Sequence, residues 1–586
     1  MGCGVFIDKT YLTQKIIFSN LWLTCTSCME CYSADLGLYK KIVDVQYLAS
    51  MNPTAGSFTI NERVQRHFAT ISCSMPETAV LKSVYGALLD GHFALNNFSD
   101  DMKDMSESLV QASIFLHQQV SRKFMPSATK FVYSWNMREL SNMFRGMLLS
   151  QATHFVKPSA FVDLWLHESN RVFADRLVTE TDYVRFQEII SDCAKKHFIN
   201  YLGDGEGDDV PDSSELPIFT AFHKSDQYEK VDDRGKLKEF IMNELSEYNE
   251  NNAIMNLELF QQALEHCTRI VRIIQNRGGS AMLIGVGGSG KQSLSRLASH
   301  ICEYPVVTIP VTSGYNVNDF MENLKEYFIT AGVKNQAFVL LMADKHVIDE
   351  RFLVYVNDIL SSGYIAELFP RDEMDAIFAS NRRDAKANGI MDTPEANLEF
   401  FIDRVKANLH VVMCFSPVGD VFRLRARRFP ALVNCTAIDW FHPWSREALV
   451  SVAARFLKDV DIAAEVKENI SHHMAEVHLS VIKESDLYRQ QTRRNVYATP
   501  KSFLELIDFF KSLLAEKRTD LNKQVNRLGT GLATLEKTAT DVAELQDDLK
   551  VTMVKVEEKQ QATQELLTKM GVQKAETQEQ QVRTFL

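Results

Sequence analysis

The sequence predicts an α/β fold in which a parallel, three-layer sheet carries a phosphate-binding loop, with helical regions beside it and a long coiled-coil helix after it. Three observations predict this fold. Short apolar runs alternate with helical patterns in the middle of the chain, a glycine-rich loop joins one of these runs to a helix, and residues from 515 onward repeat apolar side chains with heptad spacing.

The apolar runs in the middle of the chain are typical of buried strands. They lie at residues 281–284, 306–311, 337–342, 410–415 and 432–438. Strands that alternate with helices usually form a parallel sheet covered by helices on both faces, so these runs predict such a sheet. Further helices are expected at residues 446–457 and 500–514.

The region before the sheet is predicted to be mostly helical. Amphipathic repeats fill residues 76–200, whereas residues 45–49 and 68–73 have the apolar pattern of two further strands. The acidic, glycine-rich stretch at residues 203–209 has too few apolar side chains to bury and is expected to be a solvated surface loop.

The tail from residue 515 onward contains no proline and has apolar residues spaced mostly four and three apart, which is the pattern of a coiled-coil seam. These residues are Leu521, Val525, Leu528, Leu532, Leu535, Ala539, Val542, Leu549, Met553 and Val556, and the seam resumes at Leu567 and Met570. A solvated single helix is the alternative, although a helix of this length has little reason to persist without a partner.

Composition excludes several classes of protein. The 586 residues suggest about four structural units, and a formal net charge of −12 disfavours a general nucleic-acid binder. The ten cysteines are too sparse for a disulfide scaffold, which favours a reducing compartment, and no apolar run is long enough to cross a membrane. Cys25, Cys28 and Cys31 lack a clear second pair of zinc ligands, so no metal site is predicted there.

The most specific motif is a phosphate-binding loop that follows the apolar run at residues 281–284. It has the form GxxxxGK and consists of Gly285, Val286, Gly287, Gly288, Ser289, Gly290 and Lys291. Glycines allow backbone N–H groups to surround phosphate oxygens, the following helix N-terminus adds positive potential, and the lysine neutralises the β and γ phosphates. The motif predicts binding of ATP or ADP with Mg²⁺.

Two features indicate incomplete catalytic machinery. The residue after the lysine is normally Ser or Thr, whose hydroxyl holds Mg²⁺, but here it is Gln292, with Ser293 one position later. The strand at 337–342 should end in two acidic residues, of which only Asp344 is present. The sequence therefore predicts nucleotide binding more firmly than hydrolysis.

Longer stretches of the chain resemble dynein heavy chains of the axonemal kind. They include SMNPTAGSFTINERVQRHF, NMRELSNMF, LWLHESNRVFADRL, GVGGSGKQSLSRLA, FLVYVNDILSSG, FSPVGDVFRLRARRFPALVNCTAIDWF and ATPKSFLELIDFFKSLLAEKR. The resemblance implies AAA+ modules with helical small subdomains. It places residues 44–245 in the C-terminal part of the third module, 246–514 in the fourth module and 515–586 at the start of the stalk, whereas residues 1–43 do not match.

The resemblance also implies roles for individual residues. In the fourth module, Ser416 is the expected sensor-one residue, Lys501 the sensor-two residue and Arg427 the arginine finger that reaches a neighbouring module. In the third module these roles fall to Asn52, Arg138 and Arg66 respectively. A basic surface stripe is the alternative explanation for the arginines at 423, 425, 427 and 428.

The function implied by the resemblance is that of a part of an ATP-driven microtubule motor in the axoneme of cilia and flagella. Its partners would be the remaining AAA+ modules, the returning stalk helix, intermediate and light chains, and microtubules, with no nucleic acid and no membrane. The alternatives are a non-motor ATP-binding interaction module with little or no hydrolysis, and an unrelated P-loop enzyme such as a small-molecule kinase.

Overall fold

A computed structural model describes residues 30–33, 38–41, 65, 68–199, 201, 216–222, 227–255, 257–312, 314–365 and 368–584. The chain divides into two compact units, one formed by residues 1–458 and 463–503 and the other by residues 459–462 and 504–586. None of the helices among the described residues has the length and apolar character needed to cross a bilayer.

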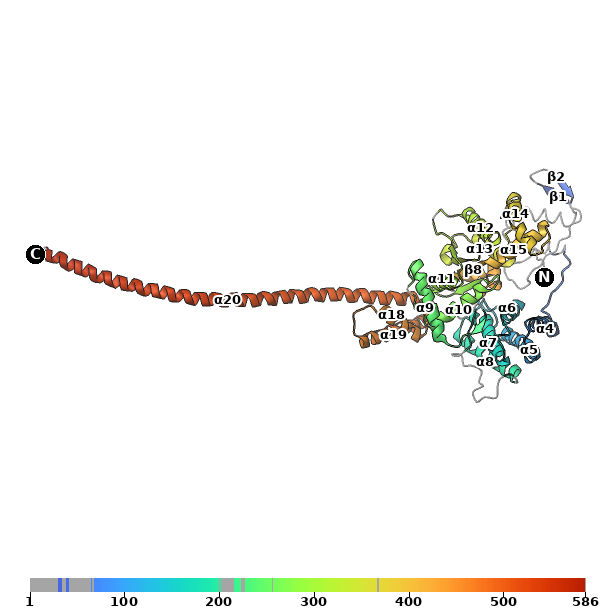
Figure 1. Cartoon of the computed structure of the whole chain (residues 1–586), viewed down its shortest axis with the longest axis horizontal. Helices are drawn as coiled ribbons and strands as arrows, with labels where there is room; N and C mark the ends of the chain where they lie inside the picture. The colour runs from blue at the N-terminus through green and yellow to red at the C-terminus, as the bar shows by residue number, and fades with distance from the viewer. Residues whose placement is uncertain are drawn as a thin grey trace. The chain divides into compact units, whose positions relative to one another are not determined.

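The first unit contains a group of five helices whose packed faces form a helical domain (Figure 1). They are α4 (Thr78–Leu95), α5 (Asp100–Lys123), α6 (Met137–Met147), α7 (Pro158–Phe173) and α8 (Glu180–Phe198). A short 3₁₀ helix, η1 (Ala174–Arg176), follows α7. Local signals fix the helix starts: Asn136 and Glu139 form a capping box before α6, and Pro158 begins α7. These helices confirm the helical prediction for residues 76–200.

Two short strands and two helices connect this domain to the sheet. Strands β3 (Phe219–Thr220) and β4 (Glu229–Lys230) pair antiparallel and are followed by α9 (Arg234–Asn251) and α10 (Gln261–Gln275). Another antiparallel pair, β1 (Glu30–Ser33) and β2 (Leu38–Lys41), precedes the helical domain. The described backbone has no strand at residues 68–73, where the sequence predicted one. Residues 69–73 are exposed, so their apolar side chains find no packed face to stabilise a strand.

The predicted parallel sheet is present and has five strands. They are β5 (Ala281–Ile284), β6 (Val306–Thr308), β7 (Phe338–Ala343), β8 (Leu409–Phe415) and β9 (Ala437–Trp440), in the order β6-β7-β8-β5-β9. Every neighbouring pair is parallel. The last strand is shorter than the predicted run 432–438, because Ala431–Asn434 forms a short helix, α17, before β9 begins.

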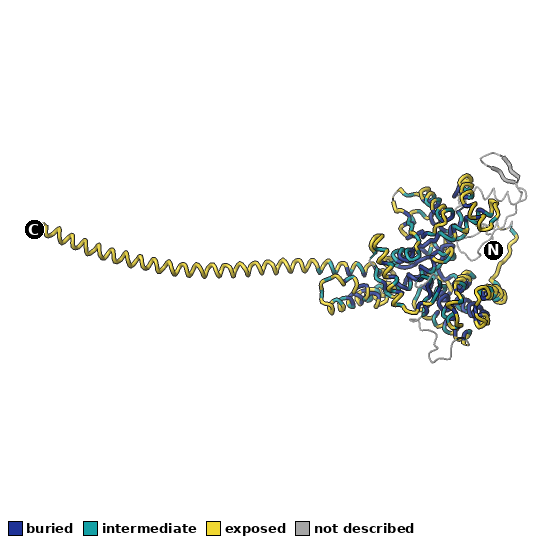
Figure 2. The backbone as a smooth tube through the Cα atoms, in the orientation of Figure 1, coloured by how far each residue is buried: buried dark blue, intermediate teal, exposed yellow. Residues whose placement is uncertain are grey.

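Helices cover both faces of the sheet, which makes the three layers. Side chains alternate along each strand, so Ala281 and Leu283 join one apolar cluster with α10 and α11 (Lys291–Ile301), whereas Met282 and Ile284 join the other. The second cluster includes side chains from α12 (Val317–Gly332), α13 (Arg351–Ser362) and α15 (Pro394–Asn408). Figure 2 shows the strands as the buried centre of this layering. The remaining elements are η2 (Asp344–His346), α14 (Arg371–Ala387) and α16 (Val421–Arg428).

Three helices follow the sheet. Helices α18 (Arg446–Phe456) and α19 (Ala464–Thr492) pack on each other within the first unit. Helix α20 then runs without interruption from Pro500 to Thr584, and all its residues from 515 onward are exposed (Figure 2). The predicted helix at 500–514 is therefore confirmed but continues into the tail. The predicted strand at 45–49 and loop at 203–209 lie outside the described residues.

Candidate functional site

The glycine-rich loop joins the carboxyl end of β5 to the N-terminus of α11, as the sequence predicted. Gly288 and Gly290 have φ angles of +84° and +86°, a left-handed conformation that residues with a β carbon rarely adopt. The loop precedes an eleven-residue helix whose first N–H groups have no partner within the helix. This arrangement directs donors and positive potential toward one place, which suits an anion such as phosphate.

Lys291 closes over this loop. Its Nζ donates hydrogen bonds to the carbonyl oxygens of Gly285 at 2.6 Å and Val286 at 2.8 Å, and to the hydroxyl of Ser289 at 3.0 Å. Burial lowers the pKa of Lys291 from 10.5 to about 8, although Cys414 and Asp344 oppose the shift. The ammonium group is thus held at the loop in an environment that a negatively charged ligand would make more favourable.

Neighbouring segments support the loop on two sides. A β carbon added to Gly285 would lie 2.6 Å from Cβ of Phe441, and one added to Gly288 would lie 2.6 Å from the backbone nitrogen of Lys501. A β carbon on Gly287 would meet no atom within 4 Å. The predicted sensor-two residue Lys501 is therefore brought to the loop by its backbone, while the loop remains open beside Gly287.

The ends of β7 and β8 add a polar group at the same edge of the sheet. The carboxylate of Asp344 accepts a hydrogen bond from the Ser416 backbone N–H at 2.9 Å and another from the Arg425 guanidinium at 3.0 Å. The Arg425 guanidinium also lies 5.9 Å from the centre of the Phe415 ring. Asp344 and Ser416, both predicted from the sequence, are thus adjacent, and each oxygen of the Asp344 carboxylate already has a partner.

The arginine that contacts Asp344 was missed by the sequence analysis, which selected Arg427 from the same helix. Arg427 is exposed in the last turn of α16, whereas only 11% of the Arg425 side chain is exposed. The sequence signal that could have separated them is the apolar pair Phe422 and Ala426, because Arg425, three residues after Phe422, lies on the same side of the helix. The proposed reach of Arg427 into a neighbouring module stays a prediction.

The hydrogen-bonding groups of the loop suit a nucleotide, but the residue at the usual Mg²⁺-ligand position is not a serine or threonine. Gln292 and Ser293 are half-buried in the first turn of α11, and the Ser289 hydroxyl donates to the carbonyl oxygen of Val286. A side-chain amide oxygen or the Ser293 hydroxyl would have to replace the hydroxyl that normally holds Mg²⁺. The described residues of the loop can therefore cradle phosphates, with weaker provision for the metal.

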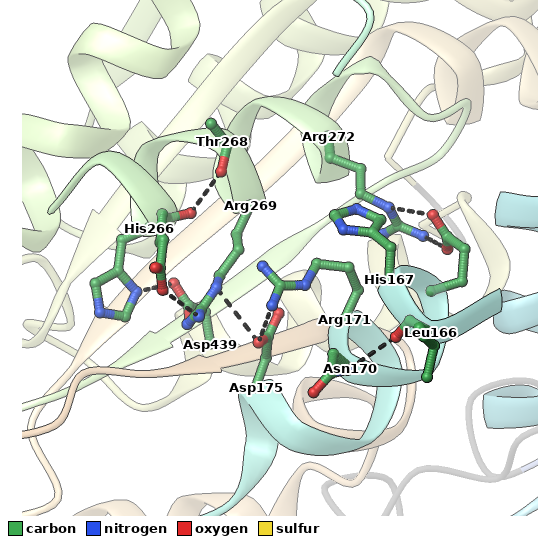
Figure 3. Close-up of polar contacts among 12 residues, drawn as sticks. Leu166, His167, Asn170, Arg171, Asp175, His266, Thr268, Arg269, Arg272 and Asp439 are labelled. Carbon is green, nitrogen blue, oxygen red and sulfur yellow. Dashed lines mark hydrogen bonds and ion pairs between the residues drawn. The ribbon is translucent and has the colours of Figure 1, made fainter. Parts of the chain in front are cut away.

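The helical domain contacts the sheet region beside this site. Arg138, the expected sensor-two residue of the preceding module, donates to the backbone oxygen of Asn434 at 3.2 Å and contacts Sγ of Cys435 at 3.4 Å. Buried ion pairs also join η1 and α7 to α10, and α10 to β9, as the close-up in Figure 3 shows. The expected counterparts of Arg138, Asn52 and Arg66, lie outside the described residues.

Three family matches cover most of the chain. Residues 255–513 match the family described as "P-loop containing dynein motor region D4", residues 109–207 match "AAA+ lid domain", and residues 9–76 match "P-loop containing dynein motor region". The last match begins inside residues 1–43, for which the sequence analysis found no resemblance. The D4 match contains the phosphate-binding loop, and the lid match falls on the helical domain.

Similar proteins are axonemal dynein chains. The chain is 46% identical over 545 residues to the dynein beta chain of the flagellar outer arm of Chlamydomonas reinhardtii, which covers 92% of this chain. It is 43% identical over 538 residues to dynein axonemal heavy chain 17 of Homo sapiens, and 42% identical over 535 residues to the ciliary dynein beta chain of Tripneustes gratilla, each covering 91% of this chain. The chain spans about 12% of the length of each of these relatives. With these relatives and an AAA+ sheet bearing a phosphate-binding loop, the chain belongs to the axonemal dynein heavy chain family.

Proposed function

We propose that residues 246–514 form the fourth AAA+ module of an axonemal dynein heavy chain, and that this module binds ATP or ADP with Mg²⁺ mainly to regulate the motor. The observation that carries the proposal is Lys291, whose ammonium group lies within the loop formed by left-handed Gly288 and Gly290 at the start of α11. In this role Lys291 would neutralise the terminal phosphates, and the loop N–H groups would bind their oxygens.

The regulatory role is supported by the residues around the expected metal. Gln292 replaces the hydroxyl that normally holds Mg²⁺, and Asp344 is followed by Lys345 rather than by a second acidic residue. The Asp344 carboxylate is also shared between Ser416 and Arg425. Bound Mg²⁺ would supply charge neutralisation on the phosphates, but a group that activates the attacking water is not evident among the described residues at this edge. Slow hydrolysis is the expected consequence.

Ser416, Lys501 and Arg427 are assigned supporting roles in the same proposal. The Ser416 N–H orients Asp344, and the backbone of Lys501 braces the loop at Gly288. Arg427 is exposed, as a finger directed at a neighbouring module must be. Through the whole heavy chain, the module would influence ATP-driven movement along microtubules in the axoneme, together with other AAA+ modules, a returning stalk helix, and intermediate and light chains.

Calorimetric binding of Mg·ATP and Mg·ADP to the full chain tests the proposal. We expect micromolar binding of both nucleotides at one site, weakened by about 10- to 100-fold in Lys291→Ala because one charge-assisted contact is lost. The matched control is Lys334→Ala, which removes an exposed lysine after α12 and should leave the affinity unchanged. Absence of nucleotide binding, or binding that Lys291→Ala leaves intact, would contradict the proposed site.

The motor role requires a separate test in a complete heavy chain. Carrying Lys291→Ala, such a chain should still move microtubules, with its velocity altered by about twofold, because a regulatory site biases the cycle and does not drive it. Complete loss of ATP turnover and movement would instead identify this module as a principal ATPase.

A further inference from the structure

Two buried ion-pair clusters join the helical domain, called the lid domain from here on, to helix α10 of the P-loop module (Figure 3). One cluster continues beyond α10 into the sheet, and the other does not. The first is centred on Arg269 and the second on Arg272, which are adjacent-turn residues of α10. Both clusters cross the same junction and start from the same helix. Variants of the two clusters therefore distinguish packing of the junction from an effect on the phosphate-binding loop.

The first cluster continues from the lid into the sheet. Asp175 in η1 lies 3.2 Å from Arg171 and 3.3 Å from Nε of Arg269, and Arg269 in turn donates to Asp439 of β9 at 3.1 Å. The other oxygen of Asp439 lies 2.7 Å from Nδ1 of His266. Asp439 is 1% exposed, and its ion pairs with His266 and Arg269 lower its pKa to about 2 despite burial. The cluster is thus a continuous chain of charged groups from the lid to β9.

From β9 the chain of contacts reaches the phosphate-binding loop. Phe441, two residues after Asp439, donates its N–H to the carbonyl oxygen of Ile284 at 2.7 Å, directly before the loop begins. Its side chain lies against Gly285, and its ring stacks on His266 with 3.8 Å between ring centres and 6° between ring planes. His266 therefore contacts both Asp439 and Phe441. A shift of Asp439 would move His266 and Phe441, and Phe441 packs against Gly285.

The second cluster stops at the junction. Arg272 forms an ion pair with Glu168 of α7, and the same carboxylate accepts a hydrogen bond from the Tyr228 hydroxyl at 2.6 Å. Glu168 is fully buried, so this pair is at least as enclosed as the first. Neither Glu168 nor Tyr228 belongs to the five-stranded sheet or to the loop.

We propose that Asp175 and Arg269 are positioning residues for the nucleotide site: through Asp439, His266 and Phe441 they let the lid domain hold the first turn of the phosphate-binding loop in place. The affinity part of this proposal rests on the proposed nucleotide-binding function, whereas the positioning itself does not. The pair Glu168 and Arg272 fastens the same junction without acting on the loop.

The physical basis is the cost of leaving buried charges unpaired. Arg269 lies between two carboxylates, those of Asp175 and Asp439, and it is held by both. If Asp175 loses its charge, Arg269 is balanced only by Asp439 and by Glu265 one turn away on α10, at 3.3 Å. The guanidinium is then expected to move toward those two groups and to change the position of Asp439, because a buried charge follows its remaining partners.

Hydrogen–deuterium exchange of the nucleotide-free full chain tests the positioning directly. Asp175→Asn should speed exchange of the amides at residues 285–290 by about tenfold, while the isosteric control Glu168→Gln should change it by less than about twofold. Both variants are expected to lower Tm, and this decrease is the control that each ion pair has been removed. Equal acceleration in the two variants, or none in Asp175→Asn, would overturn the proposal.

A second variant interrupts the chain of contacts away from the lid. His266→Gln can retain a hydrogen bond to Asp439 but removes the ring that stacks on Phe441, so it should also speed exchange at residues 285–290 by about tenfold. Unchanged loop exchange in His266→Gln would overturn the route through Phe441 even if Asp175→Asn failed to fold.

Mg·ATP affinity supplies the functional readout. Asp175→Asn should weaken binding by about fivefold and Glu168→Gln should not, since coupling along such networks is of this order. If Asp175→Asn speeds exchange of the loop amides but the wild-type chain binds no Mg·ATP, the proposed nucleotide function is rejected. The positioning of the loop by the lid domain would still hold. Nucleotide binding that is normal in Asp175→Asn despite faster loop exchange would reject the claim that the lid sets affinity.

Discussion

The backbone nitrogen of Lys501 lies directly against Gly288 of the phosphate-binding loop, where a β carbon would fall only 2.6 Å from it. Gly288 also has a φ of +84°, so two independent constraints require glycine at this position. The start of α20 thus braces the loop, and this contact explains why residue 501 matters to the site through its main chain.

Substituting Gly288 tests this contact. Gly288→Ala should destabilise the chain by on the order of 2 kcal/mol or more, because the left-handed backbone disfavours a β carbon and the added methyl group overlaps Lys501. Gly287→Ala is the stability control, since a β carbon there meets no atom within 4 Å. Thermal unfolding measures both, and equal Tm values for the two variants would contradict the described loop geometry.

The lowered pKa of Lys291 predicts proton uptake on nucleotide binding. Its pKa of about 8 should rise when a polyphosphate adds negative charge nearby, so binding at pH 8 should take up about half a proton and weaken as the pH rises further. Calorimetry in buffers of different ionisation enthalpy measures this uptake. The uptake should disappear in Lys291→Ala if that variant still binds at high nucleotide concentration, and persistence of the uptake would assign it to another group.

The lowered pKa of Lys291 also makes the free energy of unfolding depend on pH in a predictable direction. Between pH 8 and 10.5 the unfolded chain holds a proton on Lys291 that the folded chain has lost, so this group makes folding more favourable as pH rises through that window. Below pH 8 the lysine is charged in both states, and its contribution is a constant cost. Unfolding of wild type and Lys291→Met at pH 7.5 and 9.5 isolates this contribution, and a stability difference independent of pH would contradict the pKa.

Gln292 predicts a gain of metal-dependent binding when the usual hydroxyl is restored. In Gln292→Thr, the gain in ATP affinity caused by Mg²⁺ should be about tenfold larger than in the wild type, because a hydroxyl is a better-placed magnesium ligand than a side-chain amide. Gln292→Val, similar in shape to threonine but without the hydroxyl, is the control. Titration of Mg²⁺ at fixed ATP measures the effect, and equal behaviour of the Thr and Val variants would show that residue 292 does not contact the metal.

The exposed seam of α20 predicts rapid exchange in the isolated chain. Residues 515–584 bury no side chain within the described structure. Apart from the bond that Arg518 donates to the Asp461 carbonyl oxygen, the contacts described for this part of the helix are its own hydrogen bonds and ion pairs. The amides of these residues should exchange within seconds to minutes, whereas those of β7 and β8 should remain protected for hours. Protection of α20 that grows with protein concentration would instead indicate pairing of its seam with another copy.

Much of the fold could be predicted from the sequence because its signals are local. Residues 281–284 form a short apolar run directly before the glycine loop, and the observed strand β5 has these bounds. Leu432 and Val433 are equally apolar, but Pro430 and the packing of Leu432 favour a helical turn there, so a continuous strand was wrongly predicted. Periodicity cannot separate a strand from a short buried helix over so few residues.

The site was less accessible to sequence reasoning because part of it depends on distant contacts. Lys291 and Asp344 follow from motif and strand order, whereas the contact between Asp344 and Arg425 required knowing which side of α16 faces inward. The pairing of Arg269 with Asp175 and Asp439 joins segments far apart in the chain. Its one sequence signal is a charged residue within an apolar helix face, beside Ile270, and that signal does not name the partner.

Single-turnover hydrolysis of ATP by the full chain shows whether the site binds nucleotide but turns it over slowly. With excess chain over ATP, we predict a rate constant below about 0.1 s⁻¹ while the nucleotide stays bound. A rate constant of about 1 s⁻¹ or faster that is lost in Lys291→Ala would instead identify a complete ATPase at this loop and rule out a mainly regulatory site.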